Sequence, residues 1–89
     1  MNLDEDWSVS LSVTETDGQT RAEALLVMSG GDQLAGHGQA RRNPADREVP
    51  RIGAQIAAAR ALSDLAGQLL HAAATAIEDV THEQAHLHP

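Results

Sequence analysis

Residues 82 to 86 read HEQAH, which matches the pattern H-E-x-x-H. On a helix this spacing sets two histidines one turn apart, and zinc proteases use such a pair to hold their metal. A catalytic zinc site also needs a third protein ligand and a walled cleft, whereas only LHP follows the motif. We therefore interpret His82, His86 and His88 as a solvated histidine-rich tail, with adventitious zinc or nickel binding as the alternative.

Other arrangements that could do chemistry are weak. Ser63 and Asp64 are adjacent on an expected helix, and the nearest histidine, His71, lies two turns further on. The Gly36-His37-Gly38 segment lacks the third glycine and the helix start of a phosphate loop, and no G-x-S-x-G motif occurs. We expect no enzyme and no cofactor.

The length of 89 residues indicates one domain, with a core over about 7–82 and flexible termini at 1–6 and 83–89. One Trp and no Phe or Tyr predict a thin core, so we expect help from self-association. The absence of cysteine fits a reducing cytoplasm. The acidic start MNLDEDWSV is not a secretory signal, and no apolar run approaches the ~20 residues of a membrane span.

The formal net charge is −7, which would repel nucleic acid, and we expect no DNA binding. All the basic residues are arginines, however, and four of them lie in the segment RRNPADREVPR. One interpretation is a solvated loop with local ion pairs, and the other is an edge that contacts anions. The candidate anion contacts are Arg21, Arg41, Arg42, Arg47 and Arg51.

The first half of the chain predicts three strands. WSVSLSVT (7–14) alternates apolar and hydroxyl residues, which is typical of a half-buried strand. The Asp17-Gly18 turn leads to TRAEALLVM (20–28), and SGGD leads to QLAGHGQAR (33–41). Two glycines on one face of the third strand suggest that another backbone packs closely there. The expected core face comprises Trp7, Val9, Leu11, Val13, Ala22, Ala24, Leu26, Met28, Leu34, Gly36, Gly38 and Ala40.

A long helix should follow. NPAD (43–46) is a capped turn, and Pro50 suits the first helical position of a helix that ends near Thr81. Gly67 could bend or break it. Large and small apolar residues recur at spacings of three and four: Ile52, Ile56, Ala59, Leu62, Leu65, Leu69, Ala73 and Ala76. Beside them run a strip of small residues (Gly53, Ala57, Ala61), which could lie against the glycine strand, and a polar stripe (Arg60, Asp64, Gln68, His71), in which Arg60 and Asp64 can pair.

The order of elements predicts an α+β fold. We expect a three-stranded antiparallel meander followed by a long C-terminal helix, unbroken or broken near Gly67–His71, packed on one face of the sheet. Leu25 and Val27 fall on the opposite face, where their apolar side chains suggest a covering partner. His37 shares that face and is a further interface candidate.

The segments TRAEA, LAGHGQARRNPAD, VPRIG, AARALSDLAGQLL and IEDVTH stand in this order along the chain. Together they resemble a small actinobacterial family of unknown function with a fold like that of the double-stranded-RNA-binding domain. The resemblance runs from Trp7 to His82. The matching exposed polar positions are Arg21, Arg41, Asn43, Asp46, Arg60, Ser63 and Asp64. The chain departs from the family pattern at three places. Family members usually have an apolar residue at the position of His37 and an aromatic residue near Met28, and His86 is not part of the pattern.

The resemblance implies homodimers and members that are induced in dormancy or hypoxia. The family fold has been likened to ribosome hibernation factors, which implies an RNA or ribosome partner, although a shared fold does not give a function. We therefore weigh two functions: a stress- or dormancy-linked protein that binds ribosomes or structured RNA, and a dimeric protein–protein interaction module that binds no nucleic acid.

Overall fold

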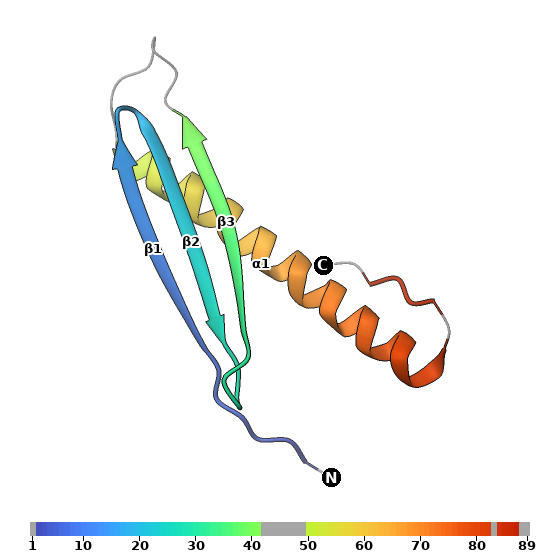
Figure 1. Cartoon of the computed structure of the whole chain (residues 1–89). Coiled ribbons are helices and arrows are strands. Elements are labelled where there is room, and N and C mark those ends of the chain that lie inside the picture. Colours follow the sequence, from blue (N-terminus) through green and yellow to red (C-terminus); the bar gives the residue numbers. More distant parts are fainter. Residues whose placement is uncertain (1, 42–49, 83, 88–89) are drawn as a thin grey trace.

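The computed structural model describes residues 2–41, 50–82 and 84–87. The elements are β1 (Ser8–Thr16), β2 (Gln19–Val27), β3 (Gln33–Arg41) and α1 (Pro50–Thr81). The strands form one antiparallel sheet in the order β1-β2-β3, and α1 packs on one face of it (Figure 1). This arrangement confirms the expected α+β meander with a C-terminal helix.

Two tight turns connect the strands. Asp17 and Gly18 both have positive φ values, 51° and 77°, as a two-residue hairpin turn requires. The second turn uses Gly30 and Gly31 at φ values of 89° and 95°. The register pairs Leu11 with Ala24, and Ala24 with Gly36, so these three positions share one face of the sheet.

The helix approaches β3 at backbone distance. A Cβ atom at Gly36 would lie 2.6 Å from the backbone nitrogen of Leu65, and one at Gly38 would collide with the backbone oxygen of Ala57. Glycine is therefore required at both positions, because any larger residue would push α1 off the sheet. The predicted contact between the small-residue strip and the glycine strand is confirmed. The buried hydrophobic residues of the described chain are Ala22, Ala24, Leu26, Ala40, Ala57, Ala61 and Leu65.

The predicted core was wrong in two places. The apolar residues of β1 are not covered: Val9, Leu11 and Val13 are 52%, 44% and 41% exposed. Three large apolar residues of α1 that precede the buried Leu65 also face solvent: Ile52, Ile56 and Leu62 are 55%, 40% and 44% exposed. Both errors have one cause, because α1 turns its small residues to the sheet and lies over β2 and β3, with little contact to β1.

The helix is continuous through Gly67 and extends well past the sheet. It spans 32 residues, and its C-terminal half projects beyond the edge of β3 (Figure 1). The helix is not interrupted at Gly67 or His71, so of the two expectations, unbroken or broken, the unbroken helix is the one observed. Within the described ranges, no helix has the length and apolar character needed to cross a membrane.

Candidate functional site

The face of the sheet opposite α1 is uncovered by any described element, and we call it the open face. The register assigns to it the even-numbered residues of β1 and the odd-numbered residues of β2 and β3. Its side chains are mainly hydroxyls, amides and guanidinium groups. It comprises Ser8, Ser10, Ser12, Thr14, Thr16, Gln19, Arg21, Glu23, Leu25, Val27, Gln33, Ala35, His37, Gln39 and Arg41.

Two of the predicted anion contacts lie together on the open face. Arg21 is paired in register with Gln39, and Arg41 lies two residues further along β3, so the two arginines are diagonal neighbours. Both are exposed, and neither has an ion-pair partner among the described residues. Between them, the Gln19 side-chain amide donates to the side-chain oxygen of Gln39 at 3.0 Å. The face therefore groups guanidinium and amide donors at one end of the sheet.

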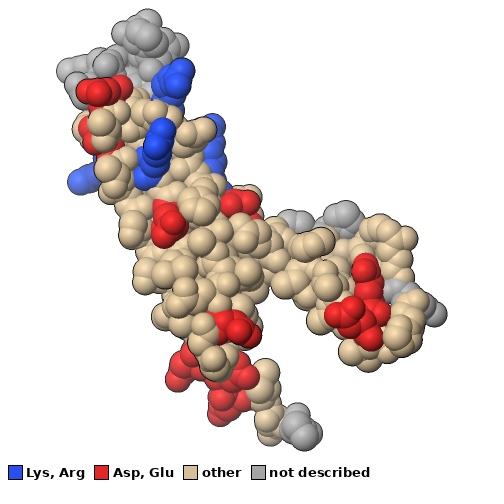
Figure 2. Space-filling view, in the orientation of Figure 1, with Lys and Arg blue, Asp and Glu red and all other residues tan. Residues whose placement is uncertain are grey.

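The charge of the molecule is strongly uneven. Arginine side chains gather at the end where β2 begins, β3 ends and α1 begins (Figure 2). Arg51, in the first turn of α1, belongs to this end, whereas Arg42 and Arg47 lie outside the described residues. Acidic side chains gather on the N-terminal segment and at the far end of α1, and a further group lies at the arginine end itself (Figure 2), where β1 and the following turn carry Glu15 and Asp17. The arginines of this acidic chain are therefore concentrated at one end, and Glu23 is the one carboxylate on the open face, because Glu15 falls on the helix side of β1.

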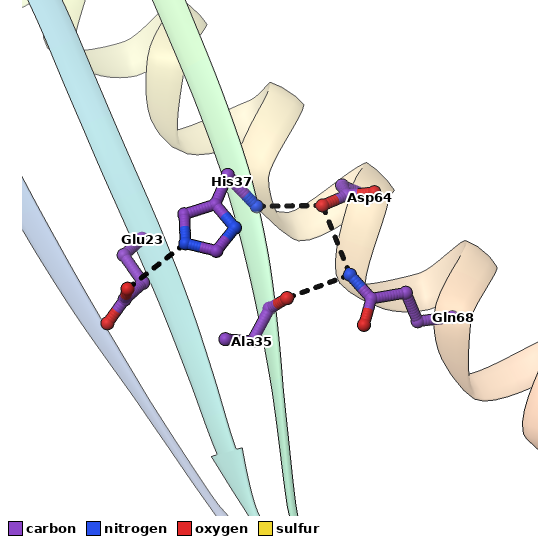
Figure 3. Close-up of polar contacts among 5 residues, drawn as sticks. All are labelled: Glu23, Ala35, His37, Asp64 and Gln68. Atoms are coloured by element: carbon purple, nitrogen blue, oxygen red, sulfur yellow. Dashed lines mark hydrogen bonds and ion pairs between the residues drawn. The ribbon is translucent and has the colours of Figure 1, made fainter.

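A second polar constellation closes the free edge of β3. The guanidinium of Arg60 donates to the backbone oxygen of Gln39 at 2.7 Å, and the side-chain amide of Gln68 donates to that of Ala35 at 2.8 Å. Between them, the carboxylate of Asp64 accepts the backbone N–H of His37 at 2.8 Å (Figure 3).

We call Arg60, Asp64 and Gln68 the edge clamp. Gln68 also donates to Asp64 at 3.2 Å, which links two members of the clamp. The expected ion pair between Arg60 and Asp64 is absent from the described part of the chain, because Arg60 binds the strand instead. The clamp uses the polar stripe for structure, and sequence reasoning missed this role although it identified the stripe.

The interface candidates occupy the other half of the open face. Leu25 and Val27 are half-buried there, as their position in β2 predicts. His37 is exposed, and its Nε2 lies 3.1 Å from the carboxylate of Glu23 (Figure 3). Because both side chains are more than half exposed, this pair adds little to stability.

The HEQAH segment does not form a helical metal motif. Helix α1 ends at Thr81, and His82 has a positive φ of 61°, so His82 and His86 do not share one helix face. Glu83 and His88 lie outside the described residues. The backbone N–H of Ala85 donates to the carboxylate of Glu78 at 3.2 Å, which brings the tail back against α1. No cluster of potential metal ligands occurs in the ranges that the structure describes.

Comparison with known proteins gives the chain close relatives but no named activity. An uncharacterised protein of Mycobacterium bovis, Mb1767, is 48% identical over 81 residues, which cover 91% of this chain and 85% of the relative. The uncharacterised protein Rv2632c of Mycobacterium tuberculosis is 45% identical over 75 residues, which cover 84% and 80% of the two chains.

The crystal structure of Rv2632c superimposes with a TM-score of 0.81 at 41% identity, over 92% of this chain and 96% of that one. The agreement confirms the fold, and the model of the Rv2632c-like family matches residues 5–86. The chain belongs to the Rv2632c-like family.

Proposed function

We propose that the protein is a non-enzymatic binding protein that contacts the phosphate backbone of structured RNA through the open face. The observation that supports this most is the diagonal placement of Arg21 and Arg41 on an uncovered sheet face. The family resemblance suggests ribosomal RNA as the target, in the cytoplasm of stressed or dormant cells.

The chemistry of the open face suits a phosphate backbone. Phosphate contacts in nucleic-acid complexes come from Arg, Ser, Thr and Gln side chains, and those types make up the basic half of this face. Arginine is favoured because its planar guanidinium can donate two parallel hydrogen bonds to one phosphate. On β1, Thr14 is paired with Arg21 and Thr16 lies diagonal to it, so their hydroxyls add donors on that side of the arginines.

The absence of aromatic residues from the open face indicates which kind of RNA it could bind. Proteins that bind single strands stack bases on aromatic side chains, and the open face has none. A folded RNA that presents backbone and ribose hydroxyls therefore fits better than an unpaired strand. The acidic N-terminal segment and helix tip would orient the protein, because they are repelled by the same polyanion that attracts the arginine end.

The test is the binding of a fluorescently labelled RNA hairpin, followed by anisotropy at several salt concentrations. Arg21→Gln/Arg41→Gln should weaken binding at least tenfold and lower the slope of log K against log salt by about 1.5 to 2. Thr75→Glu/Gln84→Glu is the matched control, because it makes the same change in net charge at exposed positions away from the face. Equal losses in both variants, or a flat salt dependence of the native protein, would contradict the proposal.

A homodimeric protein–protein interaction module is the second candidate. It is favoured by the exposed apolar stripe of β1 and by a buried core of alanines with two leucines. Leu25 and Val27 would then contact a protein partner. Analytical ultracentrifugation should give twice the chain mass of 9.4 kDa, and Leu25→Lys/Val27→Lys separates a dimer held by the open face, which would dissociate, from one held elsewhere.

A further inference from the structure

The two edges of the sheet differ in how they are closed. At β3 the outward backbone groups are those of Ala35, His37 and Gln39, and the edge clamp binds them. In an antiparallel ladder, inward and outward groups alternate along each strand. The register then directs the N–H and C=O groups of the odd-numbered β1 residues, including Val9 and Leu11, to the outer edge.

The β1 edge lacks most of the features that normally protect such a strand, and its one charged residue, Glu15, lies near its end. It is nine residues long and contains no proline, glycine or basic residue. From Trp7 to Thr14 it is also uncharged. Long, regular, apolar edge strands attract another strand, and proteins usually block them with charges, bulges or a covering element. Because the β3 edge is closed and the opposite β1 edge is open, β1 is the edge at which a further strand can extend the sheet.

We propose that a second copy of this chain pairs with β1, strand against strand and antiparallel, with the two-fold axis at Leu11. Val9 then lies opposite Val13 of the second copy, and Ser10 lies opposite Ser12. The inference rests on the homodimer named as the second candidate function, and it does not depend on RNA binding.

The register follows from the side chains. Centring the axis on Leu11 exchanges hydrogen bonds between outward-facing residues and pairs valine with valine. An axis at Ser12 would set Val9 against Glu15, and an axis at Ser10 would set Glu15 against Glu5. The Leu11 register instead pairs residues 8–14 with residues 14–8 of the second copy, so these pairs contain no carboxylate, and Glu15 lies opposite Trp7.

A second copy fits better than a different partner for reasons of surface and charge. The accessible surface is 6900 Å², whereas a compact monomer of this mass exposes about 5000 Å². The radius of gyration is 16.6 Å, against about 12 Å for a compact chain of this length. A stable interface removes about 800 Å² from each partner, and at β1 the exposed side chains of Val9, Leu11 and Val13 lie where a second copy would cover them. The uncharged centre of β1 lets two copies of an acidic chain approach without repulsion between the paired residues.

The pairing has a structural consequence. The sheet becomes continuous across the two copies, with both helices on one side and both open faces on the other. From strand spacing, the two Arg21 positions would lie about 25 Å apart on that common face. A single folded polyanion could then be contacted twice, which raises the apparent affinity without any new contact.

Single cysteines test the register, because the chain has no native cysteine. Leu11→Cys should form a covalent dimer on mild oxidation, since directly paired Cα atoms lie about 5.5 Å apart. Ser12→Cys is the matched control and should not cross-link, because its Cα atoms would be about 8 Å apart. Cross-linking of Ser12→Cys in place of Leu11→Cys would overturn the proposed pairing.

Ultracentrifugation of lysine variants gives a second readout, which does not depend on the cysteine variants. Leu11→Lys should be folded by circular dichroism but monomeric, because it sets two like charges together, whereas Ser12→Lys should stay dimeric. A native protein that is monomeric at tens of micromolar would overturn both this pairing and the homodimer. A native dimer that survives Leu11→Lys would overturn the pairing alone.

Discussion

The carboxylate of Asp64 accepts the backbone N–H of His37 at 2.8 Å, so a helix side chain takes the place of a neighbouring strand. Arg60 and Gln68, one turn to either side, bind the adjacent carbonyl oxygens of β3. The match is geometric, because four helical residues advance about 6 Å and two strand residues about 6.7 Å. The helix thereby covers one face of the sheet and also closes one edge.

Removing the central member of the edge clamp should destabilise the fold. We expect Asp64→Ala to lower the free energy of unfolding by about 1 to 2 kcal/mol, because it leaves the N–H of His37 without its charged acceptor. Asp64→Asn should keep most of this stability, since its side-chain oxygen can still accept. Urea unfolding measures both, with Asp79→Ala as the control that removes an equal charge from an exposed helix position. Equal losses of unfolding free energy for Asp64→Ala and Asp79→Ala would show that the edge clamp does not stabilise the fold.

The glycines of β3 and α1 should respond oppositely to alanine. Gly38→Ala should cost about 2 to 3 kcal/mol, because its Cβ would collide with the backbone of α1 at Ala57. Gly67→Ala should instead stabilise by about 0.5 to 1 kcal/mol, because nothing lies within 4 Å of the added atom and alanine favours the helix. Thermal and urea unfolding of the two variants give the comparison. A neutral Gly38→Ala would contradict the close approach of helix and strand.

Two leucines of α1 distinguish the observed core from the predicted one. Leu65 is 5% exposed and Leu62 is 44% exposed. Leu65→Ala should cost about 2 to 4 kcal/mol and Leu62→Ala less than about 1 kcal/mol. Similar costs would indicate that both side chains are buried in solution. In that case Leu62 belongs to an interface, and the difference would reappear on dilution to monomer.

The histidines of the tail should not affect stability. Because α1 ends before His82, His82→Ala/His86→Ala should leave the midpoint of thermal unfolding unchanged, with or without added zinc. Metal analysis of untagged protein should find no stoichiometric zinc. A zinc-dependent rise in the midpoint that this double variant abolishes would show that the tail forms a metal site.

Sedimentation of cell lysate extends the RNA proposal to the ribosome. The protein from starved cells should migrate with ribosomes or small subunits at low salt and leave them as salt rises, because phosphate contacts release counterions. Arg21→Gln/Arg41→Gln should stay at the top of the gradient. A native protein that also stays at the top, at low salt and in both growth states, would exclude the ribosome as its partner.

The elements were predictable, but the way in which they pack was only partly so. Period-two alternation and the Asp17-Gly18 turn identified the hairpin, and Pro50 and Thr81 correctly bounded the helix. The packing face of α1 was ambiguous, because apolar residues cover a broad arc of the helix. Gly36 and Gly38 indicate which face packs on the sheet, since only a helix face with side chains as small as those of Ala57 and Ala61 can approach them.

The exposure of β1 follows from dimensions that a pattern does not contain. A helix about 10 Å across covers roughly two strands spaced about 4.8 Å apart, so a third strand is left over. Alternation identifies Val9 and Leu11 as one face, but it does not tell whether a helix of the same chain or another molecule covers that face. The edge clamp was likewise visible only as a polar stripe, since its partners are backbone groups of a distant strand.

The most direct test of the open face as an RNA contact is amide chemical-shift mapping by NMR with a short RNA duplex added at low salt. We expect shifts at Arg21, Gln39 and Arg41, on one side of β2 and β3, that disappear as salt is raised. We expect none in the projecting half of α1. Unchanged spectra at low salt, or shifts confined to α1, would contradict the proposed RNA contact.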